Sequence, residues 1–128
     1  MTPALLLAAL ALFQVKHYLA DFHWQTLWMV ETKGRYGHPG GLVHAGLHGL
    51  LSLPVLMVAA PFFAPGLFAA LVIGEVVLHY HIDWSKARIV ARRGIDERDS
   101  AYWHFLGLDQ AAHQMTYLAM LAVVVLAV

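Results

Sequence analysis

The chain has 128 residues, of which 60% are hydrophobic and 12% are charged, and its formal net charge is zero. A soluble domain carries about 25% charged residues, and a disordered chain is poor in hydrophobic ones, so this composition argues against both classes. A balanced charge argues against nucleic acid as a partner. The absence of cysteine excludes thiolate zinc sites, iron–sulfur clusters and cysteine nucleophiles.

Four hydrophobic stretches follow one another along the chain, at about residues 3–24, 41–60, 66–84 and 103–124. A helix needs about 20 mostly apolar residues to cross the hydrocarbon of a bilayer. Four such stretches in a chain this short leave too little polar surface to wrap them as buried core helices. We therefore predict a single transmembrane domain over residues 1–128 with an all-α fold, a polytopic four-helix bundle.

The connections between these spans differ in charge. Residues 61–65 form an uncharged turn bounded by prolines. The connections at residues 30–40 and 85–102 carry seven of the eight basic residues. The positive-inside rule places both basic connections in the cytoplasm and both chain ends outside, an N-out/C-out topology. The second basic connection is expected to be a solvated segment that extends the third span as a helix.

Each span carries a pair of polar residues four positions apart, which places them on one helix face. The pairs lie at the C-terminal ends of spans one and three and at the N-terminal ends of spans two and four. At about 1.5 Å per residue, all four pairs fall within roughly three turns of the cytoplasmic face. The eight candidate metal ligands are His17, Asp21, His44, His48, His79, Asp83, Asp109 and His113.

Imidazole and carboxylate together suit zinc, manganese, iron or nickel. Eight side chains are more than one tetrahedral zinc needs, so we expect one or two divalent ions, with zinc first and manganese or iron as alternatives. Gln25 and Gln110 are placed to orient the ligands by hydrogen bonds. The same residues could instead form a metal-free hydrogen-bond network or a proton relay. Lys16, inside the first span, either snorkels or pairs with a carboxylate across the bundle.

A metal centre near the cytoplasmic face favours a metal-dependent hydrolase, because a bound metal turns water into a nucleophile at neutral pH. Glu75 is the candidate general base. Lys86 and Arg88 could hold a phosphate or a lipid headgroup, or simply anchor their helix. The expected partners are the lipid bilayer and a lipid or phosphate-containing substrate.

Three other functions remain open. A divalent metal transporter or sensor would require a homo-oligomer to build a pathway, and the outer halves of spans two and three offer no polar stripe. A di-iron enzyme of oxygen chemistry is typically richer in glutamate than this chain, which embeds one. A non-enzymatic subunit would use the polar network for packing, with Ala45, Gly46 and Gly49 allowing close helix contact.

The polar residues also resemble, in order and spacing, an uncharacterised family of bacterial integral membrane proteins, the domain of unknown function DUF3307. The resemblance covers essentially the whole chain and implies a small multi-pass protein of the bacterial inner (cytoplasmic) membrane, without supplying an activity. A more distant analogy is to membrane-bound metal-dependent hydrolases with histidine and aspartate in their spans. The motif reads Ala20-Asp21-Phe22 with Gln25, Met29 and Lys33; His44 with His48; Glu75, His79, Asp83 and Lys86; and Asp109-Gln110 with His113.

Overall fold

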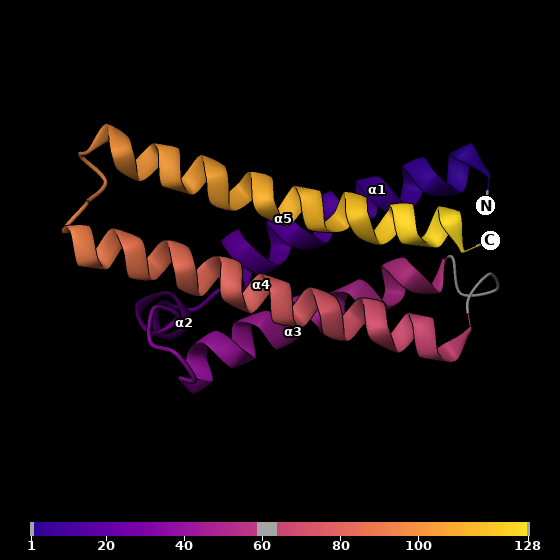
Figure 1. Cartoon of the computed structure of the whole chain (residues 1–128), viewed down its shortest axis with the longest axis horizontal. Coiled ribbons are helices and arrows are strands. Elements are labelled where there is room, and N and C mark those ends of the chain that lie inside the picture. The colour runs from indigo at the N-terminus through magenta and orange to yellow at the C-terminus, as the bar shows by residue number, and fades with distance from the viewer. Residues whose placement is uncertain (1, 59–63, 128) are drawn as a thin grey trace.

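Four long helices lie along a common direction in the computed structural model, which describes residues 2–58 and 64–127 (Figure 1). The described residues form no strand, which confirms the predicted all-α class. The elements in chain order are α1 (Pro3–Tyr18), the π-helix η1 (Leu19–His23), α2 (Leu27–Thr32), α3 (Pro39–Met57), α4 (Pro65–Arg93) and α5 (Ser100–Leu126).

The helix boundaries follow local signals. Thr2 caps α1 by accepting a hydrogen bond from the Leu5 amide at 3.3 Å, and α1, α3 and α4 each have proline in the first turn, where no amide donor is needed. The ring of His38 caps α3 by accepting from the Gly40 amide at 3.1 Å. Gly94, with a φ of 62°, ends α4 in the left-handed conformation that glycine adopts without strain.

The helices are not coextensive with the predicted spans. The third predicted span ends at residue 84, and α4 continues through charged residues to Arg93, which confirms the predicted helical extension of this span. The short helix α2 begins after the first predicted span ends at residue 24 and runs into the predicted connection at residues 30–40. Residues 59–63, the end of the predicted second span and most of the proline-bounded turn, lie outside the described residues.

Three helices in the described part of the chain are long and apolar enough to cross a membrane: Pro3–His23, Pro39–Met57 and Pro65–Arg93. The fourth, α5, has 27 residues but is missing from this group, because Asp109, His113 and two glutamines lie near its middle. The assignment of α5 as a fourth span, and the orientation of the bundle, therefore stay predictions.

The bundle differs from a soluble one in its apolar exterior and in the polar interior of one half. Large hydrophobic side chains on all four long helices point outward, among them Leu7, Leu50, Ile73 and Leu118. The interior of one half holds charged and imidazole side chains, and the interior of the other half holds a hydrophobic cluster in which the rings of Phe13 and Tyr117 stack with centroids 4.9 Å apart. An apolar exterior around a polar interior suits a lipid environment, since lipid solvates the outward-facing hydrophobic side chains.

Small residues bring α3 close to α4. Ala45 and Gly49 are buried, and a β-carbon on Gly49 would collide with the Val76 side chain of α4. Gly46 has open space where a β-carbon would be. Of the three residues predicted to allow close packing, Gly49 therefore lies in the contact with α4, Ala45 is buried, and Gly46 faces open space.

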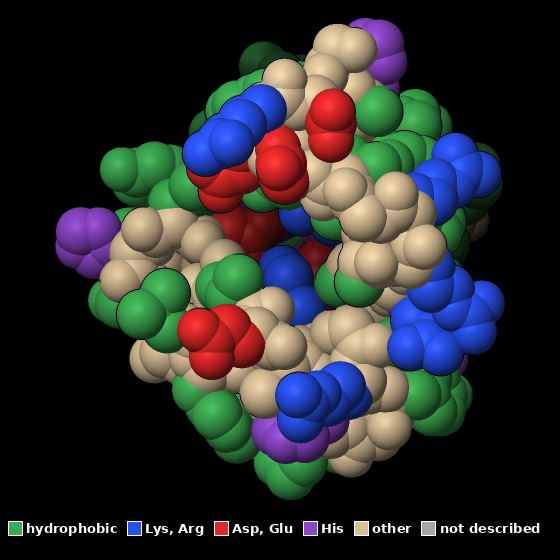
Figure 2. Space-filling model, turned by 90° about the vertical axis from the view of Figure 1, so that its left-hand side faces the viewer, with side chains coloured by type: hydrophobic (Ala, Val, Ile, Leu, Met, Phe, Trp, Pro, Cys, Tyr) green, Lys and Arg blue, Asp and Glu red, His purple; other side chains and the backbone are tan. Residues whose placement is uncertain are grey.

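Both basic connections lie at the same end of the bundle, which we call the basic end: α2, the C-terminal part of α4 and the beginning of α5 (Figure 1, left). Figure 2 looks onto this end and shows Lys and Arg side chains around a central hollow, with both cationic and acidic atoms deeper inside it. A cleft of 440 Å³ at this end is lined by Lys33, Arg35, Lys86 and Arg88, together with Tyr102. We call it the basic cleft.

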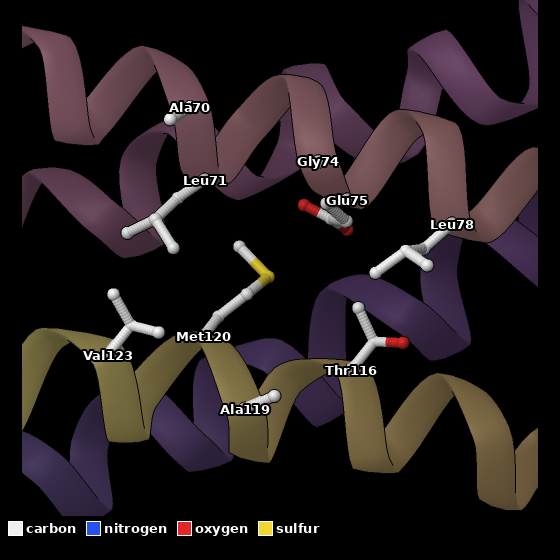
Figure 3. Close-up of a pocket in the computed structure, with 9 residues that line it drawn as sticks. All are labelled: Ala70, Leu71, Gly74, Glu75, Leu78, Thr116, Ala119, Met120 and Val123. Carbon is white, nitrogen blue, oxygen red and sulfur yellow. The ribbon is translucent and has the colours of Figure 1, made fainter.

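A second depression, the α4–α5 groove, follows the contact between the last two helices. One section, of 180 Å³, is lined by hydrophobic residues such as Leu71, Met120 and Val123 (Figure 3). The next section, of 410 Å³, lies nearer the basic end and includes Asp109 and Lys86. The two sections adjoin because both are lined by Leu78.

Candidate metal centre

The first helix changes its hydrogen-bond pattern where it supplies a ligand. The Trp24 amide donates to the Leu19 carbonyl at 2.9 Å, a separation of five residues that defines η1. This π-turn buries Ala20 and Asp21 while Phe22 and His23 remain exposed. Single π-turns within helices are often found at functional sites, because the extra residue re-aims the side chains around it.

Asp21 is the centre of the first ligand group. One of its carboxylate oxygens, Oδ1, lies 2.9 Å from His48 Nε2 and 3.2 Å from His44 Nε2, both on α3. His79 of α4 stacks on His48 with ring centroids 3.6 Å apart. Asp21, His44, His48 and His79 each present a ligand atom within 4.8 Å of the others, and all four are buried.

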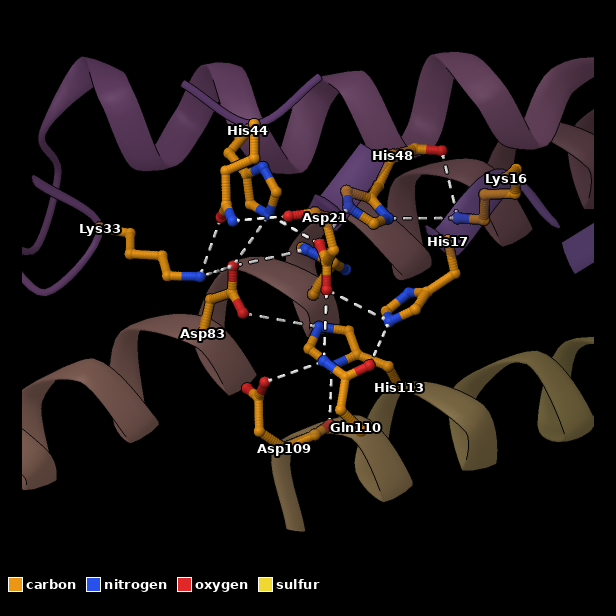
Figure 4. Close-up of polar contacts among 12 residues, drawn as sticks. Lys16, His17, Asp21, Lys33, His44, His48, Asp83, Asp109, Gln110 and His113 are labelled. Atoms are coloured by element: carbon orange, nitrogen blue, oxygen red, sulfur yellow. Dashed lines mark hydrogen bonds and ion pairs between the residues drawn. The ribbon is translucent and has the colours of Figure 1, made fainter. Parts of the chain in front are cut away.

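A second group of three residues adjoins the first and shares His79 with it. His79, Asp83 and His113 bring ligand atoms within 4.8 Å of one another, and α5 supplies His113. Asp83 Oδ1 lies 3.7 Å from His113 Nε2, and Asp83 Oδ2 lies 3.5 Å from His79 Nε2 and 3.1 Å from His44 Nε2. Figure 4 shows His44, Asp83 and His113 converging from separate helices.

The distances within the two groups suit a metal ion. Two ligands of a tetrahedral zinc with bonds of about 2.0 Å lie roughly 3.3 Å apart, and the closest contacts here range from 2.9 to 3.7 Å. Several of these atoms have no hydrogen-bond partner although they are buried: His79 Nε2, His113 Nε2 and Asp83 Oδ1. A buried polar atom without a partner costs about 1–3 kcal/mol, which a bound cation would remove. Six of the eight predicted ligands therefore form a cluster that could hold a metal ion.

The other two predicted ligands lie beside the cluster. His17 contacts Asp21 Oδ2 at 3.2 Å, but its ring nitrogens are engaged by the Tyr117 hydroxyl and by Gln110 Oε1, both at 2.9 Å. Asp109 accepts a hydrogen bond from Gln110 at 3.3 Å through Oδ2, and its buried Oδ1 has no partner. Neither residue belongs to a ligand group.

The two glutamines differ in their contacts: Gln110 binds carboxylates directly, whereas Gln25 reaches the main chain of Asp21. Gln110 donates to Asp21 Oδ2 at 3.3 Å, and Gln25 donates to the Asp21 carbonyl at 2.8 Å. Gln25 also accepts from the Lys33 ammonium at 3.1 Å, which in turn donates to Asp83 Oδ2 at 3.3 Å. Lys33 is buried. Sequence reasoning placed it only among the loop cations, and its one signal was its position in the family-like motif.

Glu75 and Lys16 form an ion pair on the side of the cluster away from the basic end. The Lys16 ammonium also donates to the His48 carbonyl at 3.4 Å and lies 4.4 Å from the centroid of the Tyr117 ring. Of the two alternatives for Lys16, the structure shows the pairing across the bundle. It places Glu75, the predicted general base, against a cation and outside both ligand groups.

Lys86 and Arg88, predicted to hold an anion, line the basic cleft. Lys86 is half-buried with its ammonium 5.6 Å from the centroid of the Tyr102 ring, and Arg88 is exposed. Lys33 connects the basic cleft with the metal-ligand cluster, because it lines the cleft and donates a hydrogen bond to Asp83 in the cluster. An anion in the cleft would therefore lie between exposed cations and the candidate metal centre.

Comparison with known proteins agrees with the resemblance read from the motif. No curated protein and no solved structure matches the chain significantly. The model of one protein family, described as a protein of unknown function, matches residues 9–128 and so includes every residue of the cluster. The chain belongs to this family, DUF3307.

Proposed function

We propose that the chain is a metal-dependent hydrolase of the bacterial inner membrane that acts on phosphate esters. The observation that carries the proposal is the cluster of four buried imidazoles and two carboxylates, several of whose atoms lack any hydrogen-bond partner. Zinc is the metal we expect first, with manganese or iron as alternatives, because mixed imidazole and carboxylate ligands suit all three.

The proposed topology has four spans, with the basic end in the cytoplasm and both chain ends outside. Its support is that both basic connections lie at one end of the bundle, as the positive-inside rule requires of cytoplasmic segments. The apolar exterior of α5, including Leu108, Met115 and Leu118, supports its place as the fourth span. The candidate centre then lies near the cytoplasmic face.

The buried charges bear on the number of ions. Four carboxylates are buried, those of Asp21, Glu75, Asp83 and Asp109. Two ammonium groups, of Lys16 and Lys33, are buried with them. With neutral imidazoles this leaves two negative charges, which one divalent ion balances. A second ion in the group of His79, Asp83 and His113 would need a compensating anion, since uncompensated buried charge is costly, and a phosphate group supplies one.

Two features favour hydrolysis over transport. The Lys16 ammonium lies beyond the cluster on the side away from the basic end, and the hydrophobic cluster of Phe13, Leu56 and Leu121 follows it. A cation leaving the centre in that direction would meet a positive charge and then an apolar layer. At the other end, the cations of the basic cleft repel metal ions and attract anions. The arrangement suits a resident metal and an anionic substrate.

The protein's residues divide the reaction among them. A metal held by the cluster would supply an activated water and would stabilise negative charge on the phosphoryl oxygens. Lys33 and Lys86 hold the phosphate. The water oxygen forms a bond to phosphorus while the ester P–O bond breaks, and the leaving alkoxide takes up the proton that the water has lost, by way of Asp109. Asp109, whose Oδ1 is buried and without a partner, accepts the proton that the water loses. This gives Asp109 the general-base role that sequence reasoning assigned to Glu75.

Metal analysis tests the centre. Protein purified in mild detergent without a histidine tag is expected to hold about one divalent ion per chain, and a second when inorganic phosphate is present. Asp21→Ala/His48→Ala should lose the metal, whereas His104→Ala, an exposed histidine of α5, should match the wild type. Full metal in the double variant would overturn the assigned ligands. No metal in any sample after reconstitution would overturn the centre.

Hydrolysis is tested separately with p-nitrophenyl phosphate. We expect a rate that EDTA abolishes and that the added metal restores. Asp109→Asn should keep the bound metal, because Asp109 lies outside both ligand groups, and should lower the rate about a hundredfold or more, the usual effect of losing a general base. A metal-loaded protein with no activity on phosphate monoesters or diesters would remove the hydrolase assignment while leaving the metal centre intact.

A further inference from the structure

We propose that the α4–α5 groove binds the hydrocarbon chain of an anionic lipid, so that the substrate of the centre is a lipid phosphate that enters from the membrane. The account of its hydrolysis rests on the proposed function, but the binding of the lipid does not. The proposal follows from where the groove runs, what lines it and what lies at its end near the basic cleft.

The groove runs along the outside of the bundle, where lipid would be. Leu78, which joins its two sections, is 51% exposed, and Leu108 at its rim is 66% exposed. From Leu71 to Lys86 the groove follows α4 for roughly 22 Å, at about 1.5 Å per residue. One leaflet of hydrocarbon is roughly 15 Å deep. The groove is therefore long enough for the chain of a membrane lipid.

The lining of the groove away from the basic end is apolar. Leu71, Met120 and Val123 meet across the space between α4 and α5 (Figure 3). Two polar residues on this wall have partners elsewhere: Glu75 pairs with Lys16 through Oε1, and the Thr116 hydroxyl donates to the Ala112 carbonyl at 3.0 Å. A hydrocarbon chain would bury apolar surface here without leaving a hydroxyl unpaired.

The end of the groove nearer the basic end is lined by charged residues as well as apolar ones. Lys86 lines both the groove and the basic cleft, so it stands at the boundary between an apolar channel and a cationic one. Asp109, with its unpartnered Oδ1, lines the same end of the groove, and Gln110 links it to Asp21 of the cluster. An amphiphile with one hydrocarbon chain and a phosphate matches both halves. Its ester would lie beside Asp109 and its charge beside Lys86.

A soluble phosphate ester would need only the basic cleft. Such a substrate would leave the groove empty, and it would not make use of the fact that Lys86 lines both the groove and the basic cleft. The groove thus distinguishes a substrate drawn from the membrane from one drawn from the cytoplasm, although both present the same phosphate to the cations.

A photoreactive probe tests the groove independently of catalysis. Hexadecyl phosphate with a diazirine near the end of its chain should label α4 and α5 around Leu71 and Met120. Ala119→Trp fills the groove far from the metal ligands, and Ala122→Trp places the same side chain at an exposed position of α5 outside it. Labelling should fall about tenfold in Ala119→Trp, the loss expected from two methylene groups left unburied. Ala122→Trp should label as the wild type does.

The outcomes separate this proposal from the previous one. Equal labelling of the two tryptophan variants, or labelling that maps to other helices, would overturn the groove even in an active hydrolase. Labelling as expected in a protein that holds no metal would support the groove and overturn only the proposed function.

Lys86→Gln should weaken labelling by hexadecyl phosphate and leave labelling by a diazirine-bearing hexadecanol unchanged. An equal effect on both probes would contradict recognition of the headgroup by Lys86. In an active enzyme, Ala119→Trp should slow hydrolysis of hexadecyl phosphate and not of butyl phosphate.

Discussion

The buried ion pair between Lys16 and Glu75 offers a perturbation whose size and functional consequence both follow from the structure. The two side chains are 5% and 1% exposed, and Glu75 Oε2 has no hydrogen-bond partner. Lys16→Met would leave a buried carboxylate with no cation, and Glu75→Met would leave a buried ammonium with no carboxylate partner, beside the carbonyl and Nδ1 of His48 and the Tyr117 ring. Removing one member of a buried pair costs about 3–5 kcal/mol.

The double variant Lys16→Met/Glu75→Met should be far less harmful than the two single changes added together. It replaces two buried charges by hydrophobic side chains of similar length, which is often neutral or stabilising. We therefore expect the sum of the single losses to exceed the loss in the double variant by about 3 kcal/mol or more, a coupling of the size that a shared buried contact produces. The free energy of unfolding in detergent, from denaturant titrations followed by helical circular dichroism, measures each corner of the cycle.

Activity in the same four proteins decides between two roles for Glu75. If Glu75 only neutralises Lys16, the double variant should keep its metal and most of its hydrolytic rate, because neither residue belongs to a ligand group. If Glu75 is the general base, the rate should fall about a hundredfold in every protein that lacks it. Additive losses of stability would refute the ion-pair argument. An inactive but stable, metal-loaded double variant would refute the assignment of the base to Asp109.

Two further predictions concern packing and topology. Gly49→Val should destabilise the bundle by about 1–3 kcal/mol, because the added side chain overpacks the contact with Val76. The control Gly46→Ala adds a methyl group to open space and should be neutral or slightly stabilising. Equal effects of the two substitutions in thermal unfolding would show that the α3–α4 contact is not as close as described. Because the chain has no cysteine, single cysteines can report orientation in intact cells. An impermeant maleimide should label Thr2→Cys from outside and leave Arg92→Cys unlabelled until the membrane is opened; the reverse pattern would invert the proposed topology.

Spacing along the sequence was enough to locate most of the cluster. Residues four apart must share a helix face, so pairs such as His44 with His48 and His79 with Asp83 were bound to point together once their segments formed helices. The alternation of chain direction then placed the pairs at one depth, and the family match includes all of them. Six of the eight candidates meet in the two ligand groups.

The differences between the predicted site and the site in the structure have identifiable physical causes. The π-turn at Leu19–His23 changes which side chains of the first helix turn inward, and hydrophobic periodicity does not encode a single five-residue hydrogen bond. His17 and Asp109 are on the predicted faces, but Gln110 and Tyr117 reach His17 first. Lys33 looks like any loop cation in the sequence, and it is buried because α2 folds it back toward Asp83.

The sequence by itself determined that the chain is helical, that several of its helices suit a membrane, and that histidine and aspartate stripes lie near one end. These properties depend on composition and on spacing within a helix, which are local. Only the tertiary structure decided which atoms meet: that Asp21 faces His48, that Lys16 neutralises Glu75, and that a groove runs beside Asp109. Such contacts depend on how each helix is rotated and how closely it approaches its neighbours, and those quantities arise from packing between segments that are distant in the chain.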